Sequence, residues 1–491
     1  MSHLKYVRVI APLTVFLVVL TVVATIGGAL VHASPSLTLV TVSSTDPYAA
    51  CSIAGQPGTN YPDAEVEPWV SVNPTKSSNI VGVWQQDRWS NGGARGLVAG
   101  FSFNGGKTWN ESTLPFSQCA PGGLPFQRAS DPWVSFGPDG TAYASAISFD
   151  RTDTKNAVAA ATSTNGGKTW SNLVTLVADG GQFSTDKNST TADPVKAGIA
   201  YTVWDTLVAP TDNPDDNPHA MAFTGDAFFS KTTDGGQSWS APLDIVHTSQ
   251  NTQTIGNQIV VDPRNGTLYD FFDLILHPTG RQFNVAFVKS TDGGTTWSQP
   301  QIISVLGTAF VTDPNTGQTI RTGDIIPEPA IDPATGQLYV VWQDARFTNG
   351  KFDEIALSTS TDGGATWSTP THQVNTNTPS NRPGFTASVR VNSAGAVGVT
   401  FYDFRNLTTQ TTMLPTDYWQ VTSTDHGTSF GNEVHIAGSF DMLTAPFASG
   451  FFVGDYEGLT NIGSTFEPFF VQTNPPPATT SNPTDVFTTF V

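Results

Sequence analysis

The chain has 491 residues, of which 38% are hydrophobic and 11% aromatic, so it can bury a large core. Its formal net charge is −19 with only 22 lysine and arginine residues, which excludes the basic footprint that nucleic-acid binding requires. Stretches rich in Thr, Val, Gly and Asn dominate and helical periodicity is scarce. This composition predicts an all-β protein.

Residues 1–33 are expected to form a signal peptide or a membrane anchor with a hydrophobic helix. An apolar run from Val9 to Val31 follows Lys5 and Arg8, an order that keeps the N-terminus in the cytoplasm and exports the rest. The segment around Ala33 offers a cleavage site, whereas the run is also long enough to span a bilayer. Both readings place residues 34–491 outside the cytoplasm, secreted or anchored at the cell surface.

The chain contains two cysteines, Cys51 and Cys119, in loops expected to flank the first repeated unit. In an exported protein such a pair favours a disulfide bond, and closing so long a loop would contribute about 4 kcal/mol. The alternative is two buried or unpaired thiols.

One eight-residue phrase recurs six times, once every 60 to 70 residues or so. Its pattern is Ser or Thr, a variable residue, Asp or Asn, usually Gly-Gly, two more residues, and Trp or Phe. Gly-Gly supplies positive φ angles and the Asp or Asn side chain accepts backbone hydrogen bonds, so each phrase predicts a tight hairpin turn. The period indicates the blades of a β-propeller. The phrases begin at Ser102, Ser163, Thr232, Ser290, Ser360 and Ser423.

A second pattern marks the first strand of each unit, where an acidic residue and proline precede an apolar strand. Degenerate versions occur at Asn257 and Thr386, which gives seven strand starts against six phrases. The strand Leu37–Ser43 could pair with the last three strands and close the ring, so we favour seven blades of four antiparallel strands. Six blades with an extra strand layer are the alternative. The clear starts lie at Glu67, Asp131, Asp193 and Glu328, and the phrase around Asp455 is expected to open one more unit.

The six phrases resemble the Asp boxes, or BNR repeats, of the sialidase superfamily of β-propellers. The resemblance covers nearly everything after residue 60, so residues 34–491 are expected to form one sialidase-like propeller. It implies a glycoside hydrolase of the exo-α-sialidase type, with a tyrosine nucleophile, an assisting glutamate, an aspartate as acid/base, and three arginines for the substrate carboxylate. Sialidases have six blades, and Asp boxes also occur in proteins that cleave no sialic acid.

Blade geometry places the first-strand starts and the second-strand ends on one face near the axis, opposite the Asp boxes. Carboxylates, guanidinium groups and aromatic rings on one face suit a carbohydrate. The expected substrate-binding residues at the second-strand ends are Trp84, Asp87, Arg88, Trp342, Asp344, Arg346, Asp403 and Arg405.

The resemblance implies Tyr456 as nucleophile, with Glu457 or Glu67 as its base, beside Asp455. Neighbouring residues of a regular strand point to opposite faces, which favours a carboxylate from another blade over Glu457. The arginine cluster would be Arg88, Arg346 and Arg405, although the Arg-Ile-Pro phrase of the family is absent and each arginine has its own nearby aspartate.

A general glycosidase needs only two opposed carboxyl groups, for which Asp131 and Glu328 are the first candidates. Either residue could instead brace neighbouring blades.

No cofactor is expected, because the histidines form no zinc motif and no phosphate loop occurs. The oxygen-rich segment Asp212–Asn217 could hold Ca²⁺, although a solvated loop accounts for it equally. The expected partner is an extracellular glycan or glycoconjugate, with the membrane contacted only through the N-terminal segment. The alternative function is a non-catalytic propeller that binds glycan or protein at the same face.

Overall fold

The computed structural model describes Met1 and residues 37–208, 211–213, 224–277, 281–369, 371–376, 382–409, 412–474 and 483–491. The chain divides into two units, Met1–Ser36 and Leu37–Val491. The expected signal or anchor helix lies outside the described residues. Within the described residues, no helix combines the length and the apolar character needed to cross a bilayer.

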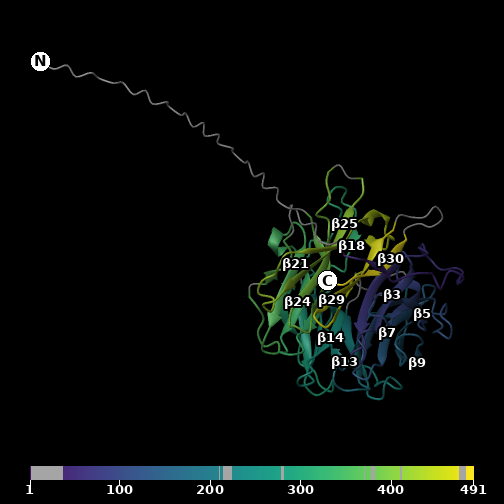
Figure 1. Cartoon of the computed structure of the whole chain (residues 1–491). Coiled ribbons are helices and arrows are strands. Elements are labelled where there is room, and N and C mark those ends of the chain that lie inside the picture. The colour runs from purple at the N-terminus through teal and green to yellow at the C-terminus, as the bar shows by residue number, and fades with distance from the viewer. Residues whose placement is uncertain are drawn as a thin grey trace. The chain divides into compact units, whose positions relative to one another are not determined.

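Leu37–Val491 consists of antiparallel units of four strands, joined in chain order (Figure 1). The first two are β2 (Glu65–Val72), β3 (Ile80–Arg88), β4 (Ala94–Ser102) and β5 (Asn110–Leu114), then β6 (Arg128–Phe136), β7 (Ala142–Phe149), β8 (Asn156–Ser163) and β9 (Ser171–Asp179). The next two are β10 (Phe183–Ala192), β11 (Ala200–Val208), β12 (Thr224–Thr232) and β13 (Leu243–Val246), then β14 (Thr252–Val261), β15 (Leu268–Leu276), β16 (Phe283–Ser290) and β17 (Gln301–Leu306).

The fifth unit is β19 (Glu328–Ile331), β20 (Leu338–Asp344), β21 (Glu354–Ser360) and β22 (His372–Gln373). The sixth is β23 (Gly384–Val391), β24 (Val397–Asp403), β25 (Pro415–Ser423) and β26 (Val434–Asp441). Short elements connect the later units: β18 (Ile320–Arg321), β27 (Phe451–Phe452) and the 3₁₀ turns η1 (Ala345–Thr348) and η2 (Met442–Thr444).

The seventh unit joins the two ends of the described chain. It consists of β28 (Gly458–Ile462), β29 (Thr465–Thr473), β30 (Thr484–Thr488) and β1 (Val40–Thr41). Val40 of β1 pairs with Thr488 of β30, so the N-terminal strand lies beside the last strand of the chain. This pairing covers a sheet edge that would otherwise be exposed.

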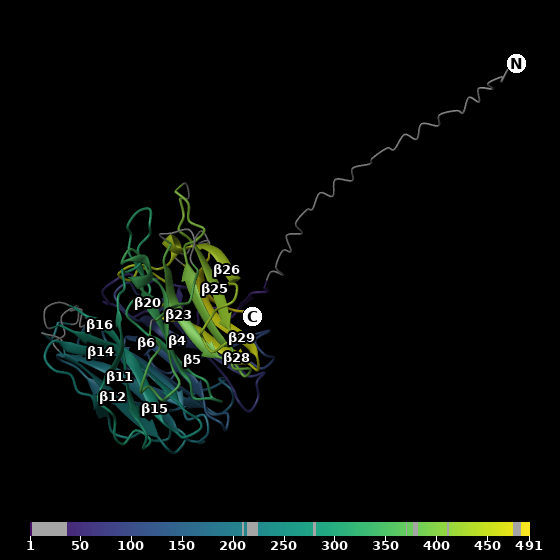
Figure 2. The same ribbon diagram turned by 90° about the vertical axis from the view of Figure 1, so that its left-hand side faces the viewer.

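The first strands of the units contact one another in a closed cycle, from β2 through β6, β10, β14, β19, β23 and β28 back to β2. Such a ring of four-stranded antiparallel units is a β-propeller. In Figure 2 the third and fourth units lie on the left, and the sixth and seventh lie on the right. The first strands therefore surround a common axis.

The six repeated phrases form the turns between the third and fourth strands of their units. In the first turn the Gly106 N–H donates to Ser102 Oγ at 3.0 Å, and the Thr108 N–H donates to Asn104 Oδ1 at 3.0 Å. The fifth turn repeats this pattern, and its side-chain and backbone donors lower the pKa of Asp362 to about 2. The phrases therefore act locally as turn-forming elements.

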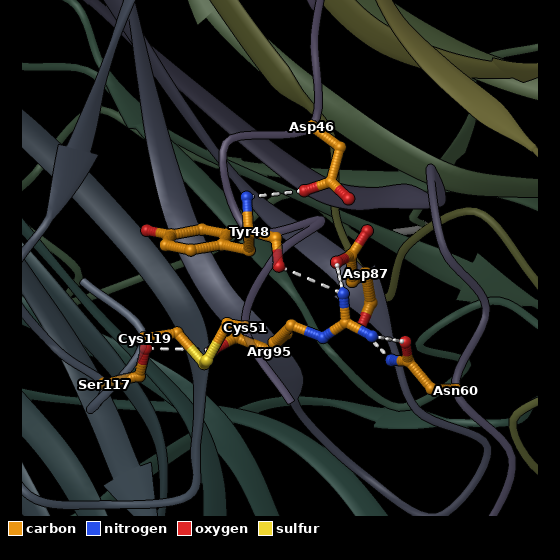
Figure 3. Close-up of a disulfide and its surroundings, with 8 residues drawn as sticks. All are labelled: Asp46, Tyr48, Cys51, Asn60, Asp87, Arg95, Ser117 and Cys119. Atoms are coloured by element: carbon orange, nitrogen blue, oxygen red, sulfur yellow. Dashed lines mark hydrogen bonds and ion pairs between the residues drawn. A yellow bond between two sulfur atoms is a disulfide. The ribbon is translucent and has the colours of Figure 1, made fainter. Parts of the chain in front are cut away.

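Cys51 and Cys119 form a disulfide with a Cα–Cα distance of 5.7 Å (Figure 3). It ties the segment before β2 to the loop before β6. Next to it Arg95 donates to Asn60 Oδ1 at 2.7 Å and to the carbonyl of Tyr48 at 3.1 Å. The segment before β2 is thus held both covalently and by a partly buried network of hydrogen bonds.

A candidate active site in an axial pocket

A cavity of about 680 Å³ opens where the first strands approach the axis. Its volume lies within the range of small-molecule binding pockets. Six charged side chains that line it come from β2, β3, β6, β10, β18 and the segment before β28. They are Glu67, Arg88, Asp131, Lys187, Arg321 and Asp455.

Three of these residues occupy the same irregularity in successive first strands. The pairing register shifts at Glu67, Asp131 and Lys187, which marks a β-bulge in each strand. Their φ angles are 54°, 51° and 44°, in the left-handed region that disfavours residues with a side chain. Each bulge re-aims one charged side chain toward the axis, and strained backbone of this kind concentrates at functional sites.

Lys187 lies at the centre of a buried ion cluster. Its Nζ lies 3.1 Å from Glu67 Oε1, 2.9 Å from Asp131 Oδ1 and 2.7 Å from Asp455 Oδ2. Burial alone would lower the pKa of this amine, but the three carboxylates raise it well above its ordinary value. The cluster therefore contains a permanent cation among three acidic groups.

Arg321 binds Asp455 from the other side. Its Nε donates to Asp455 Oδ1 at 2.9 Å while its Nη2 donates to Oδ2, a bidentate arrangement. The strand β18 that carries Arg321 pairs in parallel with β27. Gly323, with φ 65°, makes this approach feasible, because an added Cβ there would lie 2.0 Å from the carbonyl oxygen of Asp455.

Arg88 lines the same pocket with most of its donors uncommitted. Its Nη1 donates to Gln85 Oε1 at 2.6 Å, and its buried Nε has no partner among the described residues. Burial and then the neighbouring Arg321 lower the pKa of Arg88. Both guanidinium groups lie over the ring of Phe452, that of Arg88 at 4.8 Å and that of Arg321 at 4.5 Å from its centroid. Two cations that line the pocket therefore contact the same aromatic ring.

The pKa values of two carboxyl groups in this cluster are shifted in opposite directions. Burial raises the pKa of Glu67 to about 7, against the attraction of Lys187. Although burial opposes it, the charges of Arg321 and Lys187 hold the pKa of Asp455 well below its usual range. One group can therefore donate a proton near neutral pH while the other stays ionised, a division of roles typical of acid–base catalysis.

Tyr456 does not reach this pocket. Its hydroxyl is buried and has no partner among the described residues, and its ring packs 5.3 Å from that of Trp133. It lines a separate cavity of about 10 Å³, and burial raises its pKa well above 10. Glu457 instead accepts a hydrogen bond from Tyr402 at 2.9 Å and is also buried. A nucleophilic Tyr456 with Glu457 as base does not fit this geometry.

Glu328 occupies a different position from Glu67 and Asp131. In the strand pairing Glu328 lies opposite Val341, just as Trp69 lies opposite Val83 in the first unit. Glu328 therefore corresponds to Trp69, two positions after the bulge residue, and it does not line the pocket. Gln258 donates to it at 3.2 Å, and burial raises its pKa to about 8. We expected Asp131 and Glu328 to act together in acid–base catalysis, but only Asp131 lines the pocket.

Most of the residues expected to bind substrate at the second-strand ends do not line the pocket and instead contact neighbouring residues. Arg346 pairs with Asp344 and Arg405 pairs with Asp403, and none of these four lines the pocket. Asp87 accepts from Arg95 at 2.8 Å and not from Arg88. Trp84 and Trp342 are fully buried between units and present no surface to a sugar. Of the three expected arginines, the pocket therefore contains only Arg88.

Sequence reasoning missed Lys187 and Arg321. It placed a first-strand start at Asp193, which instead follows β10 and accepts a hydrogen bond from Tyr201 at 3.0 Å. The distance to the next buried tryptophan could have revealed Lys187. Lys187 lies 17 residues before Trp204, just as Glu67 lies 17 residues before Trp84. Arg321 lies in a connection outside the repeat and carried no such signal.

For Asp212–Asn217, residues 214–217 lie outside the described residues, so the suggested Ca²⁺ role stays a prediction.

No protein-family model matches the chain, and neither does any curated protein sequence. Solved structures that resemble it include a Hadza microbial sialidase, with 15% identity over 85% of this chain and 74% of that one and a TM-score of 0.47. Others are an α-L-arabinanase of Penicillium chrysogenum (15% identity, 75% and 94% covered, TM-score 0.46) and the NanB sialidase of Streptococcus pneumoniae (11%, 92% and 98%, 0.46).

These likenesses concern the fold alone, and at such scores they add no argument about activity. The β-propeller rests on the strand pairing and the closed ring of first strands. By its fold the protein is a β-propeller, and its distinctive feature is the charged axial pocket.

Proposed function

We propose that the protein is an exported glycoside hydrolase that cleaves a glycan carrying a carboxylate in the axial pocket. The observation that carries the proposal is the pair formed by Glu67, whose pKa is raised to about 7, and Asp455, whose pKa is held low, in one 680 Å³ pocket. Glycoside hydrolysis needs one protonated and one ionised carboxyl group at the same bond.

In this proposal Glu67 protonates the leaving oxygen and Asp455 stabilises the positive charge that develops on the sugar ring. One oxygen of each lies close to Lys187 Nζ, so these oxygens are within roughly 6 Å of each other, near the roughly 5 Å separation of retaining enzymes. The free donors of Arg88 would bind the substrate carboxylate. A sialic acid, the substrate that the family resemblance suggests, is one sugar of this kind.

The test is hydrolysis of fluorogenic sialoside, glucuronide and arabinofuranoside substrates by the purified protein. Glu67→Gln should lower kcat by about 100-fold or more while the melting temperature stays at or above that of the wild type. The matched control is Glu328→Gln, which alters another buried glutamate of raised pKa outside the pocket and should leave kcat unchanged. Tyr456→Phe should also retain activity. An inactive Tyr456→Phe variant would instead support Tyr456 as the nucleophile. Equal activity of wild type and Glu67→Gln would refute the assignment.

The rival function is a non-catalytic propeller that binds the same glycan. One observation favours it: each carboxylate of the cluster already contacts Lys187, and Asp455 is also bound by Arg321. Calorimetric titration with the free acidic sugars, run beside the hydrolysis assay, separates the two. Binding that depends on Arg88 without turnover of any of the three substrates would favour the binding module.

A further inference from the structure

Two exposed phenylalanine rings line the same pocket as the charged cluster. Phe183 begins β10 and is 50% exposed, and Phe310 follows β17 and is 53% exposed. Single exposed apolar residues are common on protein surfaces, so exposure alone carries no meaning. What distinguishes these two is their shared cavity and the way in which each is held.

Phe310 is fixed in an unfavourable backbone conformation. Its φ is 57°, which is rare for a residue with a bulky side chain. The buried Asp353 holds the preceding turn by accepting from the Ala309 N–H at 2.7 Å and from Thr308 Oγ1 at 2.7 Å. The Phe310 N–H donates to Thr308 Oγ1 at 3.0 Å, and its ring contacts the ring of Phe283 edge-on at 6.1 Å. The ring is thus presented to solvent by a rigid support.

Phe183 is anchored by its backbone. Its carbonyl accepts from Asn156 Nδ2 at 2.8 Å, and Asn156 Oδ1 accepts from the Thr185 N–H at 2.9 Å. These bonds join the start of β10 to the second unit and leave the ring free at the pocket wall.

The two rings come from elements that also supply members of the charged cluster, since Phe183 shares β10 with Lys187 and Phe310 shares the connection between β17 and β19 with Arg321. Arg88 comes from the first unit and Asp455 from the segment that enters the seventh. Phe183 belongs to the third unit, and Phe310 lies between the fourth and the fifth. One continuous cavity is lined by both rings and by the charged cluster, so it extends from the cluster to the rings. Its volume exceeds what one sugar ring needs and suits a ligand of two or three rings.

We propose that Phe183 and Phe310 are stacking platforms for the second and third sugars of an oligosaccharide whose terminal acidic sugar lies at Arg88. This inference rests on the proposed glycan site and adds the substrate class, a chain and not a single sugar. The apolar faces of pyranose rings pack on aromatic rings while their hydroxyl edges stay with polar groups, which matches isolated rings in an otherwise polar pocket.

The test measures how affinity depends on chain length. Calorimetric titrations use sialic acid with its α2,8-linked dimer and trimer, and galacturonic acid with its dimer and trimer. The proteins are Glu67→Gln, to prevent cleavage, alone and combined with Phe183→Ala, Phe310→Ala or Phe447→Ala. Phe447 is the matched control, since it is 46% exposed but does not line the pocket.

For the series that binds, the trimer should bind more tightly than the monomer in Glu67→Gln. Phe183→Ala and Phe310→Ala should each weaken trimer binding about five- to tenfold and leave the monomer unchanged, while Phe447→Ala changes neither. Phe183→Trp and Phe310→Trp should each preserve trimer affinity. If the phenylalanine variants lose affinity equally for monomer and trimer, or lose none, the inference is wrong. The proposed function would still stand if the wild type hydrolyses a fluorogenic monosaccharide substrate. If no acidic sugar of any length binds and none is cleaved, both proposals fail.

Discussion

Lys187 Nζ lies 2.7 Å from Asp455 Oδ2, although the two residues are 268 positions apart. Lys187 belongs to the third four-stranded unit and Asp455 precedes the seventh, so the contact joins distant parts of the ring across its axis. The same nitrogen contacts Glu67 of the first unit and Asp131 of the second. The cluster that lines the pocket therefore also fastens the units to one another.

Replacing Lys187 by methionine should strongly destabilise the protein. Three carboxyl groups would remain buried without their shared cation, a loss of about 3–5 kcal/mol at pH 8. The deficit should shrink towards pH 5, because Glu67, whose pKa burial raises to about 7, is then protonated and no longer repels Asp131 and Asp455. Melting temperatures at both pH values check this, with Lys155→Met as control, since Lys155 is exposed and pairs only with exposed Asp153 among the described residues. A deficit that does not depend on pH would contradict the electrostatic account.

The buried glutamates should make the protein less stable as pH rises. Burial raises the pKa of Glu328 from 4.5 to about 8, so the folded state favours its neutral form. Its contribution to stability is therefore complete below about pH 4.5 and is lost as pH rises through about 8. Glu354 and Glu467, whose pKa values burial also raises to about 8, act in the same direction.

Glu328→Gln isolates one of these contributions, because the amide stays neutral and of similar shape. The variant should match the wild type near pH 4.5 and exceed it at pH 8 by a few kcal/mol at most. Urea unfolding at several pH values measures the difference. Parallel pH dependences for the two proteins would show that Glu328 does not titrate in this range.

The turns could be predicted from the sequence because their determinants are local. Ser102, Asn104 and Gly106 form their hydrogen bonds within a few residues, and the same pattern of residue types recurs in six of the seven units. The pairing of an N-terminal strand with the last strands could also be anticipated, because an exposed edge and three leftover strands require a partner.

The membership of the charged cluster could not be predicted in the same way. Lys187 contacts residues 56, 120 and 268 positions away, and its side chain faces the axis only because a bulge re-aims it. Glu328 carries the same acidic-proline signal as Glu67 but lies two positions further along in the pairing register. Alternation along a strand fails wherever one inserted residue shifts the register.

The disulfide should stabilise the N-terminal segment considerably. It closes a loop between positions 68 residues apart, for which chain entropy gives about 4 kcal/mol. The double variant Cys51→Ser/Cys119→Ser should lose most of this free energy of unfolding, and reductant should lower the melting temperature of the wild type to a similar extent. Reductant should have no effect on the double variant. Equal stability with and without reductant would mean that Arg95 and its partners suffice to hold the segment.

Gly323 should control the electrostatics of Asp455 through Arg321. Its left-handed φ of 65° and its contact with the Asp455 carbonyl leave no room for a methyl group. Gly323→Ala should therefore displace Arg321 and raise the pKa of Asp455, so that stability is lost at a higher pH during acidification than in the wild type.

Gly317→Ala is the matched control for this variant. Gly317 lies in the same connection with φ 74°, but an added Cβ there meets nothing within 4 Å. Both variants bear the cost of the left-handed backbone, about 1–2 kcal/mol, which should be independent of pH. Acid titration of stability, followed by tryptophan fluorescence, separates this common cost from the shift that only Gly323→Ala should show. If the two alanine variants lose stability over the same pH range during acidification, Gly323 does not position Arg321 on Asp455.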